Sequence, residues 1–288
     1  MKTLKYYLNK AQKEKWAIGQ FNFCADSQLK GIIRAAKNLK SPIILGTSEG
    51  ESNFFGLEEA VAIRNVLRKK NNLPIFLNLD HGKSFEYLKQ AIDSGYDMVC
   101  FDGSKLSFEE NIKITKQVVK YAKRKGVLTE GEIGAIATDS SKIYQENFEI
   151  EEDLLTNPEE SVKYIDKSKV GLLAVSIGNF HGIEVSGLNP HLLLNRLAEI
   201  RRTAKNVFLV LHGGSGTPEE DIKQAISLGI VKININTEIR LAFTNSLKYF
   251  LQENPDEIAP YKYLKNSAEA VQKIVEEKIS LFKSNNKI

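Results

Sequence analysis

The 288-residue sequence contains only two cysteines, four histidines and one tryptophan, and it has no long uninterrupted apolar run. Cys24 and Cys100 have no second cysteine nearby, which argues against a disulfide framework or a paired-cysteine zinc site and favours a reducing compartment. No segment approaches the roughly 18 apolar residues that a membrane-spanning helix needs, and the lysine-rich start has no apolar signal core. We therefore expect a soluble, cytoplasmic protein that does not enter a membrane.

The charge of the chain is nearly balanced, with 40 Lys and Arg against 36 Asp and Glu and a formal net charge of +4. The basic residues are mixed along the chain, whereas nucleic-acid-binding proteins usually show a clustered basic face. We expect no nucleic-acid partner, and small anionic ligands remain open. A hydrophobic share of 42% is ample for a sizeable core.

Eight short, apolar runs recur along the chain with helix-like segments between them. The runs are Trp16–Asn22, Pro42–Gly46, Leu73–Leu79, Asp97–Phe101, Gly126–Glu132, Gly171–Ile177, Asn206–Leu211 and Ile230–Asn234. Continuous apolar runs of this kind suit parallel strands that are covered on both faces. Ser84 and Ser107 stand where helix N-caps are expected, and Gly95, Gly126 and Gly229 mark helix ends.

Eight alternations of strand and helix predict an α/β fold of the (β/α)₈ TIM barrel type. We expect a single domain over residues 1–288, with one or two extra C-terminal helices in the segment Tyr261–Lys283. A doubly wound sheet is the alternative α/β fold, but no GxGxxG follows the first strand to support a dinucleotide-binding version. The polar, acidic segment Ile133–Asn157 breaks the rhythm, and we interpret it as a mobile lid.

Three of the four histidines follow predicted strands: His81 the third, His181 the sixth and His212 the seventh. A barrel brings the carboxyl ends of its strands to one rim, so these imidazoles are expected to converge. Three neutral imidazoles with an open fourth position form a catalytic zinc site, although imidazole also suits cobalt and iron. The alternative, three unrelated loop residues, does not explain their equivalent positions. We place the fourth, His191, on the surface of a helix.

Acidic residues gather at the same predicted rim, where Asp80 precedes His81, Asp102 follows the fourth strand and Glu132 ends the fifth. Buried acids need a metal, a cation or substrate hydroxyls as partners. The alternative is that Asp102 and Glu132 cap loops and pair with Lys or Arg.

A glycine-rich turn, His212-Gly213-Gly214-Ser215-Gly216, follows the seventh predicted strand, and Asn234-Ile235-Asn236-Thr237 ends the eighth. Glycines permit a ligand to approach the backbone, and loops at these two places commonly bind phosphate in a TIM barrel. The two turns together indicate a phosphate site.

The ordered set of motifs resembles the class II, zinc-dependent ketose-bisphosphate aldolases, which include the fructose-1,6-bisphosphate and tagatose-1,6-bisphosphate enzymes. The motifs are Leu79-Asp80-His81-Gly82, Phe101-Asp102-Gly103-Ser104, Glu130-Gly131-Glu132-Ile133-Gly134, Ala174–Gly182, Leu211–Gly216 and Lys232–Glu238. They occur in family order from about residue 16 to residue 240, and the segment Tyr261–Lys287 is also similar.

The resemblance implies an enzyme that reversibly cleaves a ketose 1,6-bisphosphate, most readily fructose 1,6-bisphosphate, through a zinc-stabilised enediolate. By resemblance, the zinc ligands are His81, His181 and His212, and Asp80 removes the proton of the C4 hydroxyl group. Asp102 and Glu132 match acids that hold a second cation or keep the zinc ligands in place. The matched substrate-binding residues are Gly182, Gly213, Ser215, Asn234 and Thr237 at dihydroxyacetone phosphate, and Ser48 and Arg240 near the second phosphate.

The sequence also departs from the family. Many members carry Gly-Gly-x-Glu-Asp after the counterpart of Glu132, with a glutamate that handles the C3 proton, whereas this chain reads Ala137-Thr138-Asp139-Ser140-Ser141. Either Asp139 or Glu146 replaces that glutamate from the loop, or the C3 proton is handled in a different way in this branch of the family. Ile183-Glu184-Val185 replaces a frequent Tyr-Lys, and Asn236 stands where fructose-type enzymes often have aspartate.

These departures leave alternatives open. The substrate could be tagatose 1,6-bisphosphate or a deoxyketo-sugar phosphate, and a sugar-phosphate binding protein without turnover is a further alternative. By resemblance we expect a homodimer or homotetramer.

Overall fold

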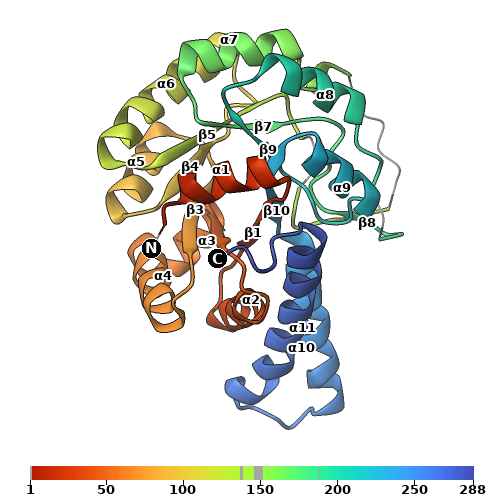
Figure 1. Ribbon diagram of the computed structural model, residues 1–288. Helices are drawn as coiled ribbons and strands as arrows, with labels where there is room; N and C mark the ends of the chain where they lie inside the picture. The colour runs from red at the N-terminus through yellow and green to blue at the C-terminus, as the bar shows by residue number, and fades with distance from the viewer. Residues whose placement is uncertain (1, 137–138, 146–151, 188) are drawn as a thin grey trace.

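The eight predicted strands close into one parallel barrel in the computed structural model, which describes residues 2–136, 139–145, 152–187 and 189–288 (Figure 1). The barrel strands are β1 Ile18–Asn22, β2 Ile43–Ser48, β3 Ile75–Gly82, β4 Met98–Phe101, β5 Leu128–Ile133, β7 Leu172–Val175, β9 Phe208–Leu211 and β10 Ile230–Ile235. They follow one another around the barrel in chain order, and β1 pairs with β10 to close it, Ile18 opposite Lys232. The predicted TIM barrel is confirmed.

Helices alternate with the strands on the outside of the barrel (Figure 1). They are α1 Leu4–Glu14, α2 Asp26–Asn38, α3 Glu49–Phe55, α4 Leu57–Asn71, α5 Phe85–Ser94, α6 Phe108–Lys125, α7 Pro158–Ser168, α8 Leu194–Thr203, α9 Glu219–Ser227, α10 Thr237–Glu253 and α11 Pro260–Leu281, with a 3₁₀ turn at Glu152–Leu154. The predicted caps are present, since Ser84 accepts a hydrogen bond from the Tyr87 amide and Gly126 is left-handed with φ 72°. Among the described helices, none combines the length and hydropathy that crossing a bilayer would require.

Helix α1, which was not predicted, packs against one end of the barrel. Its buried side chains, including Leu8 and Ala11, form a cluster with Trp16, Ile18 and other residues from the amino-terminal ends of the strands. The barrel therefore has an apolar floor, separate from the larger core between the strands and the outer helices.

Above this floor the interior of the barrel is polar. Residues two apart along a strand point to the same side, so Gln20 and Asn22, Asn78 and Asp80, Glu130 and Glu132, and Lys232 and Asn234 form two polar layers. The contact between Lys232 and Glu130 spans the interior, because β10 and β5 are not neighbours in the barrel.

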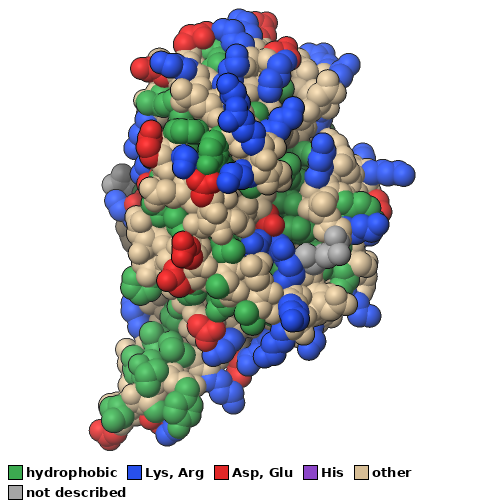
Figure 2. Space-filling model, turned by 90° about the vertical axis from the view of Figure 1, so that its left-hand side faces the viewer, with side chains coloured by type: hydrophobic (Ala, Val, Ile, Leu, Met, Phe, Trp, Pro, Cys, Tyr) green, Lys and Arg blue, Asp and Glu red, His purple; other side chains and the backbone are tan. Residues whose placement is uncertain are grey.

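The helices α10 and α11 pack together as a hairpin that projects from the barrel (Figure 1). Helix α11 confirms the extra C-terminal helix expected in the segment Tyr261–Lys283. Four large apolar side chains of the hairpin are exposed, namely Tyr249, Leu251, Ile258 and Tyr261. Hydrophobic side chains are visible on the protruding lower tip of the molecule in Figure 2.

Candidate metal and active site

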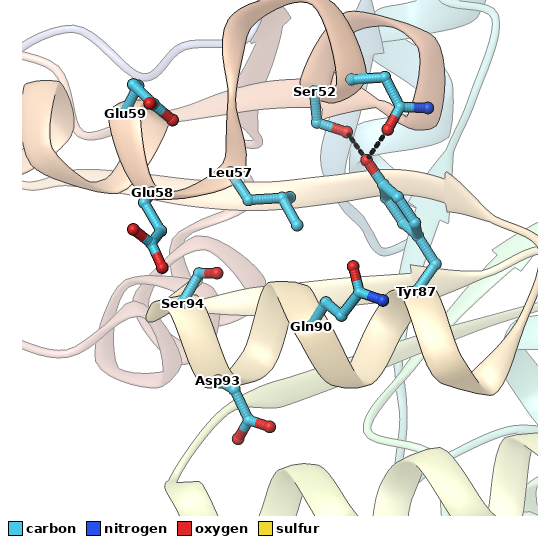
Figure 3. A pocket seen from close by; sticks show the side chains of 9 residues that line it. Ser52, Leu57, Glu58, Glu59, Tyr87, Gln90, Asp93 and Ser94 are labelled. Carbon is cyan, nitrogen blue, oxygen red and sulfur yellow. Dashed lines mark hydrogen bonds between the residues drawn. The ribbon is translucent and has the colours of Figure 1, made fainter.

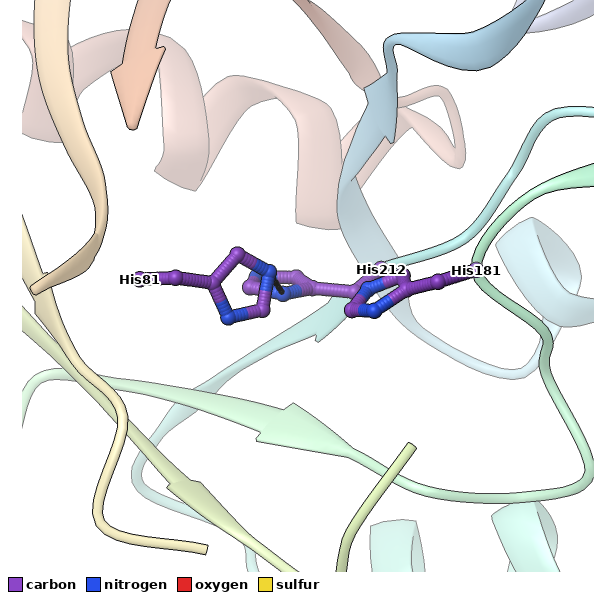
Figure 4. A group of neighbouring side chains, drawn as sticks. All are labelled: His81, His181 and His212. Carbon is purple, nitrogen blue, oxygen red and sulfur yellow. Dashed lines mark hydrogen bonds between the residues drawn. The ribbon is translucent and has the colours of Figure 1, made fainter. Parts of the chain in front are cut away.

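Three histidines converge at the carboxyl-terminal mouth of the barrel, as predicted: His81 at the carboxyl end of β3, and His181 and His212 after β7 and β9 (Figure 4). Each offers a ring nitrogen, and these atoms all lie within 4.8 Å of one another. Nε2 of His81 and Nδ1 of His212 are 2.9 Å apart. Two ligands of a tetrahedral zinc ion lie about 3.3 Å apart, given Zn–N distances of about 2.0–2.1 Å, so only a small adjustment would let both bind one ion.

A break in the regular strand brings Asp80 and His81 to the same site. Adjacent residues of a strand normally point to opposite faces. Here the pairing of β3 with β4 shifts register between Leu79 and Gly82, and His81 adopts a left-handed backbone with φ 51°. A bulge of this kind re-aims a side chain, so both side chains reach the mouth of the barrel.

Carboxylates lie behind two of the imidazoles. Nδ1 of His81 is 3.3 Å from Oδ2 of Asp102 and 3.5 Å from Oε2 of Glu132. Nε2 of His212 is 2.6 Å from Oε1 of Glu130. In metalloproteins, such carboxylates fix the orientation of a ligating histidine. Asp102 and Glu132 therefore lie where they can hold His81, and both could also share a second cation with it.

The three imidazoles differ in protonation when no cation is bound. Burial lowers the pKa of His81, but the adjacent Asp80 and Asp102 outweigh burial and raise it to about 10, so His81 must lose a proton to bind a cation. Burial and the neighbouring Asp102 raise the pKa of Glu132 to about 8, and its Oε2 atom is buried without a hydrogen-bond partner. Burial and the adjacent His81 and His212 lower the pKa of His181 to about 3, which keeps it neutral, as a metal ligand must be. An unsatisfied buried carboxylate oxygen beside three imidazoles fits a divalent cation.

Asp80 is held by two asparagines from the far side of the mouth. Asn22 donates a hydrogen bond to Oδ2 over 3.0 Å, and Asn234 donates one to Oδ1 over 2.9 Å. Burial raises the pKa of the Asp80 carboxyl, but the nearby His81 and His212 outweigh burial, so the pKa lies below its ordinary value. Asp80 is therefore an oriented carboxylate that can accept a proton.

The mouth of the barrel is a cavity of about 910 Å³. The cavity is lined by Asp80, His81 and His181 and by all the predicted substrate-binding residues except Arg240, namely Ser48, Gly182, Gly213, Ser215, Asn234 and Thr237. Lys83, Lys105 and Lys142 also line it and give it cationic walls.

Two glycines in the wall of the cavity are required by the close approach of neighbouring backbone. A Cβ atom at Gly213, whose φ is 63°, would lie 2.1 Å from the Phe180 carbonyl oxygen. A Cβ atom at Gly182, whose φ is 90°, would lie 2.7 Å from the Lys142 carbonyl oxygen. Only glycine tolerates both the conformation and the contact, so the two loops pack with their backbones exposed to the cavity.

Arg240 is not among the described residues that line the cavity. Its guanidinium donates to Oε1 of Glu51 over 2.6 Å and to the Ser140 hydroxyl over 3.2 Å. Thr237 donates to the Ser140 carbonyl over 2.8 Å, so the first turn of α10 holds the loop segment that contains Ser140. Arg240 thus lies behind the wall that was expected to bind the second phosphate.

The loop 133–157 is described only in part. Its strand β6, Ile143–Tyr144, pairs with β8, Ile183–Glu184, just after His181. Asp139 lines the cavity and accepts hydrogen bonds from the amide and hydroxyl of Ser141, each 2.8 Å long. The other candidate loop acid, Glu146, lies outside the described residues.

Several residues of the site were missed. Glu130, Lys232 and Glu51 are buried and bonded to predicted site residues, and a period of two within the strands was the available signal for the first two. Asn189 donates to the carbonyls of Gly182 and Ser215 and so connects the two glycine-containing loops of the cavity wall. The prediction of a helix at His191 was wrong. This exposed residue precedes α8, and its ring lies 3.0 Å from Asp221.

A second hollow of about 520 Å³ lies on the outer surface between α3, α4 and α5 (Figure 3). The Tyr87 hydroxyl there is already hydrogen-bonded to Ser52 and Asn53, 2.8 Å from each. Glu58, Glu59 and Asp93 make its wall acidic, so it does not offer a phosphate site.

Comparisons with known proteins agree with this arrangement. The sequence profile described as "Fructose-bisphosphate aldolase class-II" matches residues 2–287. The sulfofructosephosphate aldolase of Alkalicoccus urumqiensis is 39% identical over 283 residues, covering 98% of this chain and 96% of that protein. The fructose-bisphosphate aldolase of Geobacillus stearothermophilus is 36% identical over 288 residues, covering 99% and 98%. The crystal structure of the YdjI aldolase from Escherichia coli K12 superposes with a TM-score of 0.84 at 31% identity, covering 100% of this chain and 99% of that one.

Proposed function

Because the chain belongs to the class II fructose-bisphosphate aldolase family, a family of lyases, we propose that it reversibly cleaves fructose 1,6-bisphosphate to dihydroxyacetone phosphate and glyceraldehyde 3-phosphate. The observation that carries the proposal is the placement of an oriented carboxylate, Asp80, directly beside three converging imidazoles in a cavity with a glycine-rich wall.

We assign the metal ligands to His81, His181 and His212, and we propose zinc as the ion, since it favours three imidazoles and an open position. A bound divalent cation would act as a Lewis acid that stabilises negative charge on the substrate oxygens during carbon–carbon cleavage. Asp102 and Glu132 keep His81 oriented, and Glu130 does the same for His212. Asp102 and Glu132 are also the acids that would hold a second cation.

Asp80 is the proposed acid–base residue. As a carboxylate it removes the proton of the substrate's C4 hydroxyl group, and breaking the C3–C4 bond then releases the aldehyde. In the condensation direction it returns the proton. Its two hydrogen bonds from Asn22 and Asn234 hold both oxygens in place, which is the condition for efficient proton transfer.

The phosphate of dihydroxyacetone phosphate is assigned to the wall made by Gly182, Gly213, Ser215, Asn234 and Thr237. Two features support this. Exposed backbone at glycines can approach an anion closely. The turn after β10 also starts helix α10 at Thr237, and helix N-termini favour negative charge. The proton at C3 is assigned to Asp139, the described loop acid at the cavity.

The proposed substrate carries a second anionic group, at C6. We assign it to the side of the cavity near Ser48, with the lysines of the wall as its cations, and with Arg240 in reach only if it gives up Ser140 or Glu51. That engagement favours a second candidate, a ketose phosphate with a sulfonate at C6, because a sulfonate carries one charge and needs less cationic compensation than a phosphate. A relative with 39% identity bears the name of such an activity.

We also propose that the enzyme is cytoplasmic and forms a homodimer or homotetramer through the exposed apolar tip of the α10–α11 hairpin. The exposed fractions of Ile258 and Tyr261 are 88% and 77%, and contiguous exposed apolar side chains commonly mark interaction sites.

The decisive experiment measures the metal content of the purified protein together with a coupled cleavage assay on fructose 1,6-bisphosphate, its tagatose epimer and 6-sulfofructose 1-phosphate. Activity on one of them that disappears with a chelator and returns with zinc supports the proposal. Full activity in protein stripped of metal, or a metal-loaded protein that cleaves none of the three, contradicts it.

A further inference from the structure

The polar layer beneath the site contains a buried lysine, Lys232, to which the reaction assigns no part. Its side chain has no exposed surface. Its Nζ atom lies 2.8 Å from Oε2 of Glu130 and donates a hydrogen bond to Oδ1 of Asn234 over 2.8 Å. A buried ammonium group is costly unless such partners satisfy it.

Each of the two partners of Lys232 also contacts a proposed site residue, Glu130 contacting His212 and Asn234 contacting Asp80. Oε1 of Glu130 lies 2.6 Å from Nε2 of His212, whose Nδ1 faces Nε2 of His81. The amide nitrogen of Asn234 donates to Asp80 over 2.9 Å. The single ammonium of Lys232 therefore stands between a metal-ligand candidate and the acid–base carboxylate.

The ammonium group fixes which atoms donate and which accept along two series of contacts, one from Lys232 through Glu130 to His212 and one from Lys232 through Asn234 to Asp80. It can only donate hydrogen bonds, whereas an asparagine amide or an imidazole can present either a donor or an acceptor. Asn234 must therefore turn its oxygen to Lys232, which leaves its NH₂ group for Asp80. Glu130 must stay an acceptor, so His212 must carry its proton on Nε2 and keep the lone pair of Nδ1 free.

We propose that Lys232 is a positioning residue that fixes the donors and acceptors along both series of contacts, so that His212 presents its Nδ1 lone pair to the metal position and Asn234 presents its amide NH₂ to Asp80. The effect on turnover rests on the proposed function. The effect on metal binding rests only on the proposed ligand set and not on the reaction.

Two variants separate positioning from simple charge compensation. Lys232→Met leaves Glu130 without its cation, so a loss of stability is expected whatever the role of Lys232. The double variant Lys232→Met/Glu130→Gln removes both charges and should recover much of the Tm. Because Glu130→Gln by itself disturbs His212, that single variant is the reference, and kcat of the double variant should lie at least about 10-fold below that of Glu130→Gln. Lys232→Met alone should lower metal affinity, measured by competition with a chelator, about 10–100-fold.

The tautomer of His212 can be measured directly, because the chain has only four histidines to assign. Nitrogen-15 NMR of the metal-free protein, labelled at histidine, should show His212 protonated on Nε2 in the wild type and as a mixture of tautomers in the double variant. The control is Arg64→Met, which removes a buried cation from its ion pair with Asp97, a residue that precedes β4 at the opposite end of the barrel. It should lower the Tm and leave metal affinity unchanged.

Wild-type metal affinity in Lys232→Met, or a double variant with the kcat of Glu130→Gln, would overturn the inference, because Lys232 would then only neutralise Glu130. An unchanged His212 tautomer in the double variant would overturn it as well, and so would an equal loss of metal affinity in Arg64→Met. A wild-type protein that binds zinc but cleaves no ketose phosphate would refute the proposed function alone, since affinity and tautomer are measured without substrate.

Discussion

Asn234 donates a hydrogen bond to Asp80 over 2.9 Å, although 154 residues separate the two in the sequence. The contact joins the last strand of the barrel to the third and fixes one oxygen of the carboxylate, while Asn22 of the first strand fixes the other. Closure of the barrel is therefore a condition for the Asp80 carboxylate, the proposed acid–base group, to be oriented.

Replacement of Asp80 tests its role. Asp80→Ala should lower kcat by about 10²–10⁴, the usual contribution of a positioned acid–base group, while the metal stays bound. Asp80→Asn, which keeps the shape, should lose a similar factor because an amide cannot take the proton. Steady-state kinetics and metal analysis on the same preparations check this, and an Asp80→Ala enzyme as active as the wild type removes the residue from the reaction.

Removal of an imidazole should remove the metal. His181→Ala is expected to weaken metal binding by at least about 100-fold, more than the loss of a residue that only orients a ligand. His191→Ala is the matched control, since His191 is exposed and lies outside the cavity lining. Chelator competition measures both variants, and a His181→Ala protein with wild-type affinity contradicts the proposed ligand set.

The loop acid can be tested by isotope exchange. Asp139→Asn should slow the exchange of the C3 proton of dihydroxyacetone phosphate into deuterated water by about 10²-fold or more, if Asp139 carries that proton. Asp166→Asn, an exposed acid on α7, is the control. An unchanged exchange rate would exclude Asp139 and direct the same experiment to Glu146.

A charge on the exposed apolar tip of the α10–α11 hairpin should weaken the proposed assembly of subunits. Ile258→Asp and Tyr261→Asp place a carboxylate on the exposed apolar tip, and desolvating that charge would oppose association. Sedimentation should show a smaller assembly for both variants at micromolar concentration. Val66→Asp, at a 61% exposed position on α4, should leave the mass unchanged. A wild-type protein that sediments as a monomer contradicts the proposed assembly.

Alkaline pH should destabilise the fold through Tyr164. Burial raises the pKa of this phenol above its ordinary value of 10, and the hydroxyl is bonded to Thr115 and Asn111. A raised pKa in the folded state means that the stabilising contribution is complete below pH 10 and is lost as the pH rises from 10 towards the folded-state value. Tyr164→Phe should cost about 1–3 kcal/mol at pH 7 and show a shallower loss above pH 10 in urea unfolding. An equally steep loss in the variant rejects this origin.

Much of the architecture could be predicted because parallel strands buried on both faces leave continuous apolar runs in the sequence. The rim histidines could be predicted because a barrel gathers its strand ends at one mouth. Lys232 and Glu130 could not be paired in advance, since they lie on strands that face each other across the interior and only closure of the barrel brings them together.

One helix and one set of contacts were not foreseen, for different physical reasons. The helix α1 has a mean hydropathy that resembles a surface segment, and its role at the floor of the barrel depends on tertiary packing. Arg240 was expected at the second phosphate because its charge suits an anion, but Glu51 and Ser140 compete for it. A sequence does not reveal such competition before the contacts are known.

The left-handed backbone of His81 makes this position suited to glycine. A residue other than glycine in the left-handed conformation costs about 1–2 kcal/mol of folding free energy. His81→Gly would therefore relieve backbone strain at this position and would also remove the imidazole ring. The variant would keep its fold and leave a gap of the size of an imidazole ring beside the proposed metal position. Free imidazole, or another small nitrogen donor added to the solution, would then fit in that gap. The choice of the added donor would set the reactivity of the proposed metal site.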